Sequence, residues 1–153
     1  MRMNRSQKIG LAKTKGIFLP DLLLTETIVC VYGFFAVKSG KKECFYIGKT
    51  TSLWSRMLDS GSGHVHNYLN GYISKLVPNK INFYIDSGYE VHVEVLEEVD
   101  YHDTSFSRAT HRLSYAELKH IIKYQEKGEC LDQRPEGIGK NEEKYWTNNY
   151  YVK

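Results

Sequence analysis

The sequence lacks the features that place a chain in a membrane or in a disulfide-rich class. No apolar run approaches the roughly 20 residues that a membrane-spanning helix needs, so we expect no membrane association. The apolar stretch at 17–24 is too short, and too interrupted by Pro20 and Asp21, to be the core of a secretory signal. The cysteines are odd in number and without CxxC spacing, which argues against a disulfide framework and a zinc ribbon; they are Cys30, Cys44 and Cys130. These absences predict a protein of the reducing cytoplasm.

Acidic residues are missing from positions 1–15, whose charged residues are all basic: Arg2, Arg5, Lys8, Lys13 and Lys15. Such a segment either follows a phosphate backbone or forms a disordered, solubilising terminus. Internal repeats and an inter-domain linker are also missing, and 153 residues suffice for one core. We therefore expect one globular domain at 28–132, a basic arm and lead-in at 1–27, and an aromatic polar tail at 133–153.

Hydrophobic periodicity predicts the secondary structure of the domain. Two apolar and aromatic runs, at 28–37 and 43–48, flank a polar turn with a glycine and predict a β-hairpin. Clean alternation predicts a strand at 90–99, and 101–110 is expected to be an extended loop. Helices are predicted at 53–58, at 67–77 before Pro78, and at 114–127, with a further short apolar run at 81–85. The fold class that follows is an α/β (α+β) sandwich, with a small mixed or antiparallel sheet of three to four strands flanked by helices.

Polar side chains gather around the hairpin and the helix that follows it. Tyr32 and Tyr46 lie on its two strands, Lys49 follows the second, and Arg56 comes just past the first turn of the predicted helix. Two phenols, an ammonium and a guanidinium near a helix N-terminus suit a bound phosphate.

This stretch resembles the GIY-YIG nucleases. Val31-Tyr32 stands where that family has Ile-Tyr, Tyr46-Ile47-Gly48 matches the second triplet, and Arg56 has the spacing of the family's arginine. Cys30 departs from the first triplet, and the loop between the triplets is longer than usual. The resemblance covers about 28–132. It implies an endonuclease that hydrolyses DNA phosphodiester bonds, in which Arg56 holds the phosphate and Tyr32 and Tyr46 flank the attacking water.

The resemblance also implies that a helix glutamate, Glu117, binds one divalent cation, Mg²⁺ (or Mn²⁺). Glu117 lies one turn before Ile121 and so borders the apolar stripe of its helix. The alternative is a capping box formed by Ser114 and Glu117, in which the carboxylate only closes the helix N-terminus. For the tyrosines the alternative is packing within the sheet, and for Arg56 it is a solvated surface charge. We expect Arg56, Lys49 and a metal to lower the pKa of the phenols.

Further site residues are predicted from their position in the sequence or from their charge. His66-Asn67 resembles the His-Asn stretch of phage-type homing members, so His66 is predicted to assist catalysis, with His64 as the alternative. The predicted substrate-binding residues are Lys49, His64, Arg5, Lys13 and Lys15. The family's asparagine after the glutamate helix is missing here, and Asp132, Asn141 or another later residue is expected to replace it.

Three functional interpretations follow. The first is a metal-dependent DNA endonuclease, such as a freestanding restriction, phage, bacterial or repair enzyme, with a homodimer expected if both strands are cut. The second is a nucleic-acid-binding module of the same fold without turnover. The third is an interaction protein whose tyrosines belong to the core. The aromatic tail either stacks on bases or packs on the core or on a dimer partner, and packing is slightly favoured.

Overall fold

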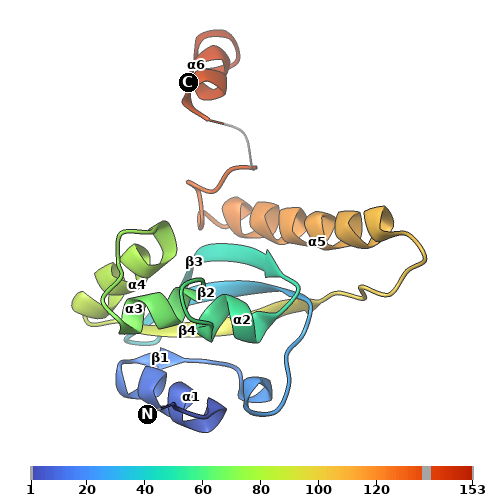
Figure 1. Ribbon diagram of the computed structural model, residues 1–153. Coiled ribbons are helices and arrows are strands. Elements are labelled where there is room, and N and C mark those ends of the chain that lie inside the picture. The colour runs from blue at the N-terminus through green and yellow to red at the C-terminus, as the bar shows by residue number, and fades with distance from the viewer. Residues whose placement is uncertain (1, 136–138, 153) are drawn as a thin grey trace.

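The computed structural model describes residues 2–135 and 139–152 of the chain (Figure 1). In chain order its elements are α1 (Arg5–Thr14), β1 (Ile17–Phe18), the 3₁₀ helix η1 (Asp21–Leu24), β2 (Cys30–Lys38), β3 (Lys41–Thr50), α2 (Leu53–Leu58), α3 (His64–Leu69), α4 (Leu76–Asp86), β4 (Glu90–Glu98), α5 (Phe106–Glu126) and α6 (Lys140–Asn149). Among the described residues, no helix is long and apolar enough to cross a membrane.

The sheet has four strands in the order β1-β4-β2-β3, with β1 parallel to β4 and the other pairs antiparallel. The protein is therefore a mixed α+β fold, compatible with the predicted sandwich. The hairpin and the strand at 90–99 are confirmed. The fourth strand, β1, comes from the segment that we assigned to the lead-in.

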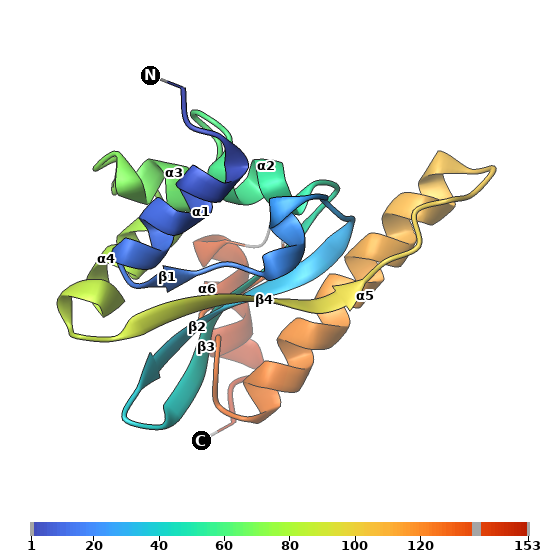
Figure 2. The same cartoon turned by 90° about the horizontal axis from the view of Figure 1, so that it is seen from below.

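Helices cover both faces of the sheet (Figures 1 and 2), and a separate core lies on each face. Alternate residues of β2 contribute to the two cores. Tyr32, Phe34 and Ala36 pack with α1–α4, whereas Val31 and Phe35 pack with α5. This is the period of two that a strand buried on both faces requires. The cysteines also divide between the cores, Cys30 toward α1–α4 and Cys44 and Cys130 toward α5; all three are buried and free.

A β-bulge in β3 changes the register midway along the hairpin. Phe34 pairs with Tyr46 while Phe35 pairs with Cys44, so Phe45 is an extra residue. The bulge lets Phe45 and Tyr46 both pack on the α1–α4 side, and Cys44 still faces α5. Tyr46 thus lies on the same side as Tyr32.

The predicted helix at 67–77 is wrong. Helix α3 ends at Leu69, and Gly71 follows at φ 78°, a left-handed conformation that favours glycine. Pro78 lies inside the first turn of α4, where its missing N–H costs no intrahelical hydrogen bond. The apolar run at 81–85 belongs to the same helix.

Helix α5 begins at Phe106, earlier than predicted, because the Ser105 side chain accepts a hydrogen bond from the backbone N–H of Arg108. The predicted loop at 101–110 is therefore partly helical, and Ser114 lies in the helix interior. The capping-box interpretation of Glu117 is wrong. Leu118 and Ile122 of this helix are exposed, whereas Leu113 and Ala116 are buried.

The basic N-terminal segment is ordered. Helix α1 has a capping box between Asn4 and Gln7, and Ala12 is fully buried in the core shared with β2. The Arg5 guanidinium donates to the backbone carbonyls of Leu23 and Glu26. The interpretation of this segment as a disordered terminus is wrong.

The C-terminal segment does not pack on the core in this structure. Each described residue from 139 to 152 is exposed, and Figure 1 shows α6 apart from the sheet and its covering helices. The ion pair between Arg134 and Glu143 links α6 to the segment after α5. Packing of the tail on a dimer partner, or stacking on bases, stays a prediction.

Gly48 lies directly opposite Tyr32 in the hairpin. The Tyr32 ring passes over this glycine: a Cβ at position 48 would lie 2.5 Å from Cζ of Tyr32 and closer still to its hydroxyl. The absence of a side chain at Gly48 is therefore a packing requirement of the buried phenol.

We expect Gly48→Ala to lower the free energy of unfolding by about 1–3 kcal/mol, because the tyrosine ring has to shift within a packed core. Urea unfolding measures this. Gly10→Ala is the matched control, because its Cβ would meet nothing within 4 Å and the position is helical. That variant is expected to gain up to about 1 kcal/mol. Equal stability of the two variants would contradict the packing argument.

Candidate active site

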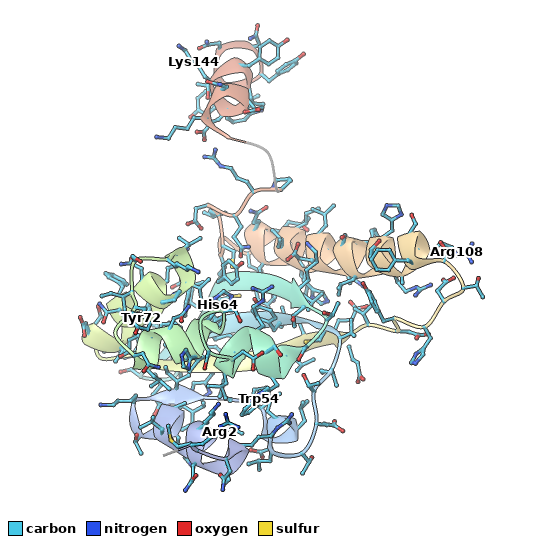
Figure 3. The ribbon with its side chains drawn as sticks, in the orientation of Figure 1. Arg2, Trp54, His64, Tyr72, Arg108 and Lys144 are labelled. Carbon is cyan, nitrogen blue, oxygen red and sulfur yellow. The ribbon has the colours of Figure 1, made fainter. Side chains whose placement is uncertain are left out.

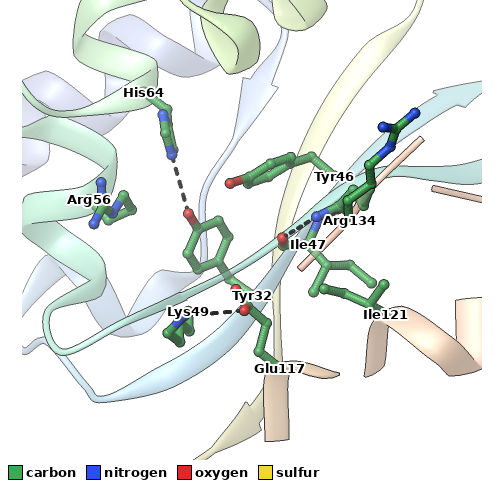
Figure 4. Close-up of a pocket in the computed structure, with 10 residues that line it drawn as sticks. Tyr32, Tyr46, Ile47, Lys49, Arg56, His64, Glu117, Ile121 and Arg134 are labelled. Atoms are coloured by element: carbon green, nitrogen blue, oxygen red, sulfur yellow. Dashed lines mark hydrogen bonds and ion pairs between the residues drawn. The ribbon is translucent and has the colours of Figure 1, made fainter. Parts of the chain in front are cut away.

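A cavity of about 480 Å³ opens at the free edge of the sheet (Figure 4). Its lining includes the predicted site residues Tyr32, Tyr46, Lys49, Arg56, His64 and Glu117. They come from β2, β3, α2, α3 and α5. The structure therefore brings together residues that span 85 positions of the sequence, from 32 to 117.

The cavity draws on both faces of the sheet because β3 is the edge strand. The two tyrosines project on the α1–α4 face. Lys49 is opposite Val31, which is buried against α5, and cross-strand partners share a face. Gly48 lies between these two sides with no side chain of its own. The phenols and the Lys49–Glu117 pair consequently meet around the edge of one strand.

The phenol of Tyr32 contacts His64, with 3.2 Å between the hydroxyl oxygen and Nε2. Burial, together with the nearby Arg56, lowers the pKa of His64 to about 4, so the imidazole is neutral at neutral pH. Burial raises the pKa of Tyr32, with Tyr46 adding to the rise and Arg56 opposing it. The Tyr32 hydroxyl thus keeps its proton and can donate it to Nε2.

The expectation that cations lower the pKa of the phenols is wrong for the protein without bound ions. Arg56 does lower the pKa of Tyr46, but burial outweighs it and the carboxylate of Glu117 adds to the rise. Desolvation disfavours a phenolate more than one partly solvated guanidinium favours it. Ionisation of either phenol then requires additional positive charge in the cavity.

Arg56 and Glu117 carry the opposite charges of the site. Arg56 is exposed, and among the described residues its guanidinium has no ion-pair partner. Glu117 is about one-fifth exposed (22%) and lies 3.3 Å from Nζ of Lys49. The guanidinium is therefore available to an anion, and the carboxylate is shared with a lysine at the cavity wall.

The residues present fit a single hard cation that completes its coordination from substrate and water. The described residues contain no cluster of three or more histidine, cysteine or acidic side chains, and Glu117 is the carboxylate at this cavity. Mg²⁺ commonly takes one or two carboxylates, keeps several waters and binds substrate phosphate oxygens. Lys49 would have to release the Glu117 oxygen for such an ion to bind.

Two polar lining residues were not predicted as site residues, Gln133 and Arg134. The Gln133 amide makes two hydrogen bonds to Ile47 on the free edge of β3: the backbone N–H donates to Oε1 at 2.6 Å, and Nε2 donates to the carbonyl at 2.8 Å. Gln133 fixes the edge strand that carries Tyr46 and Lys49. Its side-chain amide was the available signal, since Gln133 directly follows Asp132, one of the residues expected to replace the missing asparagine.

The two residues expected to replace that asparagine lie elsewhere. Asp132 pairs with Lys80 at 3.0 Å. Asn141 is on the exposed α6. Among the described residues, neither is hydrogen-bonded to Ile47, whereas Gln133, which lies between them in the sequence, is.

Four other predicted site residues lie outside the cavity. His66 follows His64 by two positions and lines a different cavity, next to Asn70. Arg5 is engaged by backbone carbonyls and by the Trp54 ring. Lys13 and Lys15 are exposed at the end of α1. Only His64 of the two histidines lies with the phenols.

Comparisons with protein-family models, with curated proteins and with solved structures find no match to this chain. The function is therefore argued from the geometry of the cavity.

Replacing Gln133 with alanine should expose the Ile47 amide and lower the free energy of unfolding by about 1–3 kcal/mol, since it leaves two backbone groups without partners. Amide hydrogen exchange at Ile47 and urea unfolding measure the two effects. Asp132→Ala is the matched control. It removes only the ion pair with Lys80, which contributes little to stability because the Asp132 carboxylate is 66% exposed. Unchanged hydrogen exchange at Ile47 in the Gln133 variant would contradict the role of Gln133 in holding the edge strand.

Stability should fall as pH is lowered between about 6.5 and 4, because the pKa of His64 is depressed from its ordinary 6.5 to about 4 in the folded state. In that window the unfolded chain binds more protons, so the free energy of unfolding decreases with falling pH, by about 1–3 kcal/mol. Urea unfolding at several pH values measures the slope. His64→Gln should flatten it, and His102→Gln, at a fully exposed side chain, should not.

Proposed function

We propose that this protein is a metal-dependent endonuclease of the GIY-YIG type that hydrolyses DNA phosphodiester bonds. The observation that carries the proposal is the meeting of Tyr32, Tyr46, Arg56, His64 and Glu117 around one cavity. These are the groups that phosphodiester hydrolysis needs: a cation for the phosphate, a carboxylate for a metal, and a path for the proton of water.

Arg56 holds the scissile phosphate, since its planar guanidinium matches two phosphate oxygens. Lys49 contributes a second positive charge once it releases Glu117. Glu117 holds the Mg²⁺ (or Mn²⁺), which when bound supplies charge to a non-bridging oxygen of the phosphate.

The proton of the attacking water passes to Tyr32 as Tyr32 gives its own proton to His64. The hydroxyl oxygen and Nε2 are 3.2 Å apart, within reach of a direct transfer. This relay does not require a free phenolate, which the burial of Tyr32 disfavours. Tyr46 orients the water and the phosphate from the neighbouring strand.

One observation favours a second function. The Lys49–Glu117 ion pair occupies the carboxylate that a metal requires. If this pair persists when nucleic acid binds, the chain is a nucleic-acid-binding module without turnover. The interaction-protein hypothesis has the exposed aromatic residues of α6 as its support. A homodimer is proposed only for cleavage of both strands, because one cavity per chain serves one phosphate at a time.

Glu117→Ala should reduce Mg²⁺-dependent cleavage of plasmid DNA at least 100-fold while DNA binding in EDTA is retained. Gel assays of nicking and linearisation measure this. Glu126→Ala is the matched control, an exposed glutamate of the same helix that does not line the cavity. DNA binding without cleavage by the wild type would favour the binding module, and absence of both would contradict the nuclease.

Tyr32→Phe should also reduce cleavage, by about 10²–10⁴-fold, because the ring is kept and only the relaying hydroxyl is lost. His64→Gln should reduce it as well. Combining the two changes should cost little beyond either alone, since both interrupt one relay. Additive losses in kcat would contradict a shared proton path.

A further inference from the structure

A second cavity lies on the other side of the α2–α3 layer. Its volume is about 520 Å³, and α1, α2, α3 and the segments before α1 and after α2 form its walls. Its polar lining includes Arg2, Lys8, Ser60 and His66, over apolar groups such as Leu11 and Leu58. No described residue in this lining is acidic. The mechanism proposed above uses none of these residues.

Helices α2 and α3 each contribute to both cavities through residues two positions apart. Arg56 and His64 line the first cavity, and Leu58 and His66 line the second. Residues two apart on a helix point to nearly opposite sides, because each residue turns by about 100°. Figure 3 shows His64 and Arg2 on opposite sides of the ribbon of this layer. A helix is about 10 Å wide with its side chains, so the two cavities are separated by roughly that distance.

One cation of the second cavity, Lys8, contacts Trp54 of α2, beside Arg5 of the same helix α1. The Arg5 guanidinium lies 4.5 Å and the Lys8 ammonium 5.8 Å from the centre of the Trp54 ring. These cation–π contacts fix α1 against α2 and restrict the Lys8 side chain. A restricted ammonium loses less entropy when an anion binds.

We propose that this cavity, here called the α1–α3 cavity, binds a phosphate of the DNA backbone outside the scissile position. The proposal rests on the nuclease function proposed above. Arg2 and Lys8 pair with the phosphate, Ser60 and His66 offer hydrogen bonds, and the apolar floor accepts the adjoining sugar. A duplex presents one phosphate charge per about 1.7 Å of its axis, so a strand crossing α2–α3 has phosphates within reach of both cavities.

The polyanion is a better match than a free anion because of where the cavity lies. Arg56 and the α1–α3 cavity are on either side of one short layer, and the lining of the latter combines cations with apolar groups. The acid-free N-terminal segment thereby acquires a defined binding role, through Arg2 and Lys8 in place of the expected Arg5, Lys13 and Lys15.

The test compares two double variants in a Glu117→Ala background, which prevents cleavage. One is Arg2→Ala/Lys8→Ala. The matched control is Lys41→Ala/Lys123→Ala, which removes the same charge from exposed positions that line neither cavity. Fluorescence anisotropy with a labelled 30-base-pair duplex in EDTA, between about 50 and 300 mM KCl, gives the affinity and its salt dependence.

We expect Arg2→Ala/Lys8→Ala to weaken binding about tenfold and to reduce the slope of log K against log[salt] by about 1, for the one phosphate contact that is lost. The control should change affinity by less than about threefold. Equal losses of affinity in both double variants would mean that the loss comes from net charge alone, and this would overturn the proposal. Unchanged binding in both would overturn it too.

A scan with single methylphosphonates, which are uncharged, locates the contact along the strand. The Glu117→Ala protein should show two separate sensitive positions, and Arg2→Ala/Lys8→Ala should lose only one of them. A single sensitive position would overturn the α1–α3 cavity while leaving the nuclease intact. Absence of DNA binding and cleavage by the wild type would instead overturn the nuclease function and this inference with it.

Discussion

The register of the β2–β3 hairpin is the constraint on which the candidate site depends. It places Tyr32 opposite Gly48, so that the phenol lies over the one position of β3 without a side chain. The bulge at Phe45 then turns Tyr46 to the same face. A shift of β3 by one residue along β2 would send Tyr46 to the α5 side, away from Tyr32, because alternate residues of a strand point to opposite faces. The amide of Gln133, bonded to Ile47, secures the free edge of the same strand.

The electrostatics of the cavity follow from its burial. Its phenols and its imidazole are all driven toward their neutral forms, because desolvation disfavours their charged forms; Arg56 adds to this effect at His64 and is outweighed at the phenols. Charge is left on the groups nearest to solvent, Arg56, Lys49 and Glu117. The site thus has a neutral hydrogen-bonded interior, in which protons can move, and a charged rim, to which an anion can bind. This division is the physical basis of the proposed relay from water through Tyr32 to His64.

The short helices α2 and α3 form a layer with a different set of groups on each side. One side faces the candidate active site, and the other meets α1 at a cationic cavity. Because the two histidines are two positions apart in α3, only one of them can reach the phenols. The packing of α1 against α2, through the Trp54 ring, completes the second side. In the proposed function a single layer therefore contacts the substrate at two places.

The sequence by itself determined the hairpin, the strand at 90–99, helix α2 and the residues Tyr32, Tyr46, Arg56, Lys49 and Glu117 as one group. Local periodicity and turn chemistry are sufficient for the hairpin, the strand and the helix, since each is a property of neighbouring residues. Glu117 joined the group only through the resemblance to the GIY-YIG nucleases. The limits of α3, α4 and α5 were mispredicted where tertiary packing and capping outweighed periodicity. Pro78 lies in the first turn of α4, and Ser105 caps α5 about two and a half turns before Ser114. Only the tertiary structure decided that His64 and not His66 faces the phenols, that Gln133 clamps the edge strand, and that burial raises the pKa of the tyrosines. These properties depend on groups far apart in the chain, and their distances and solvation exist only once the sheet and its two helical layers are packed.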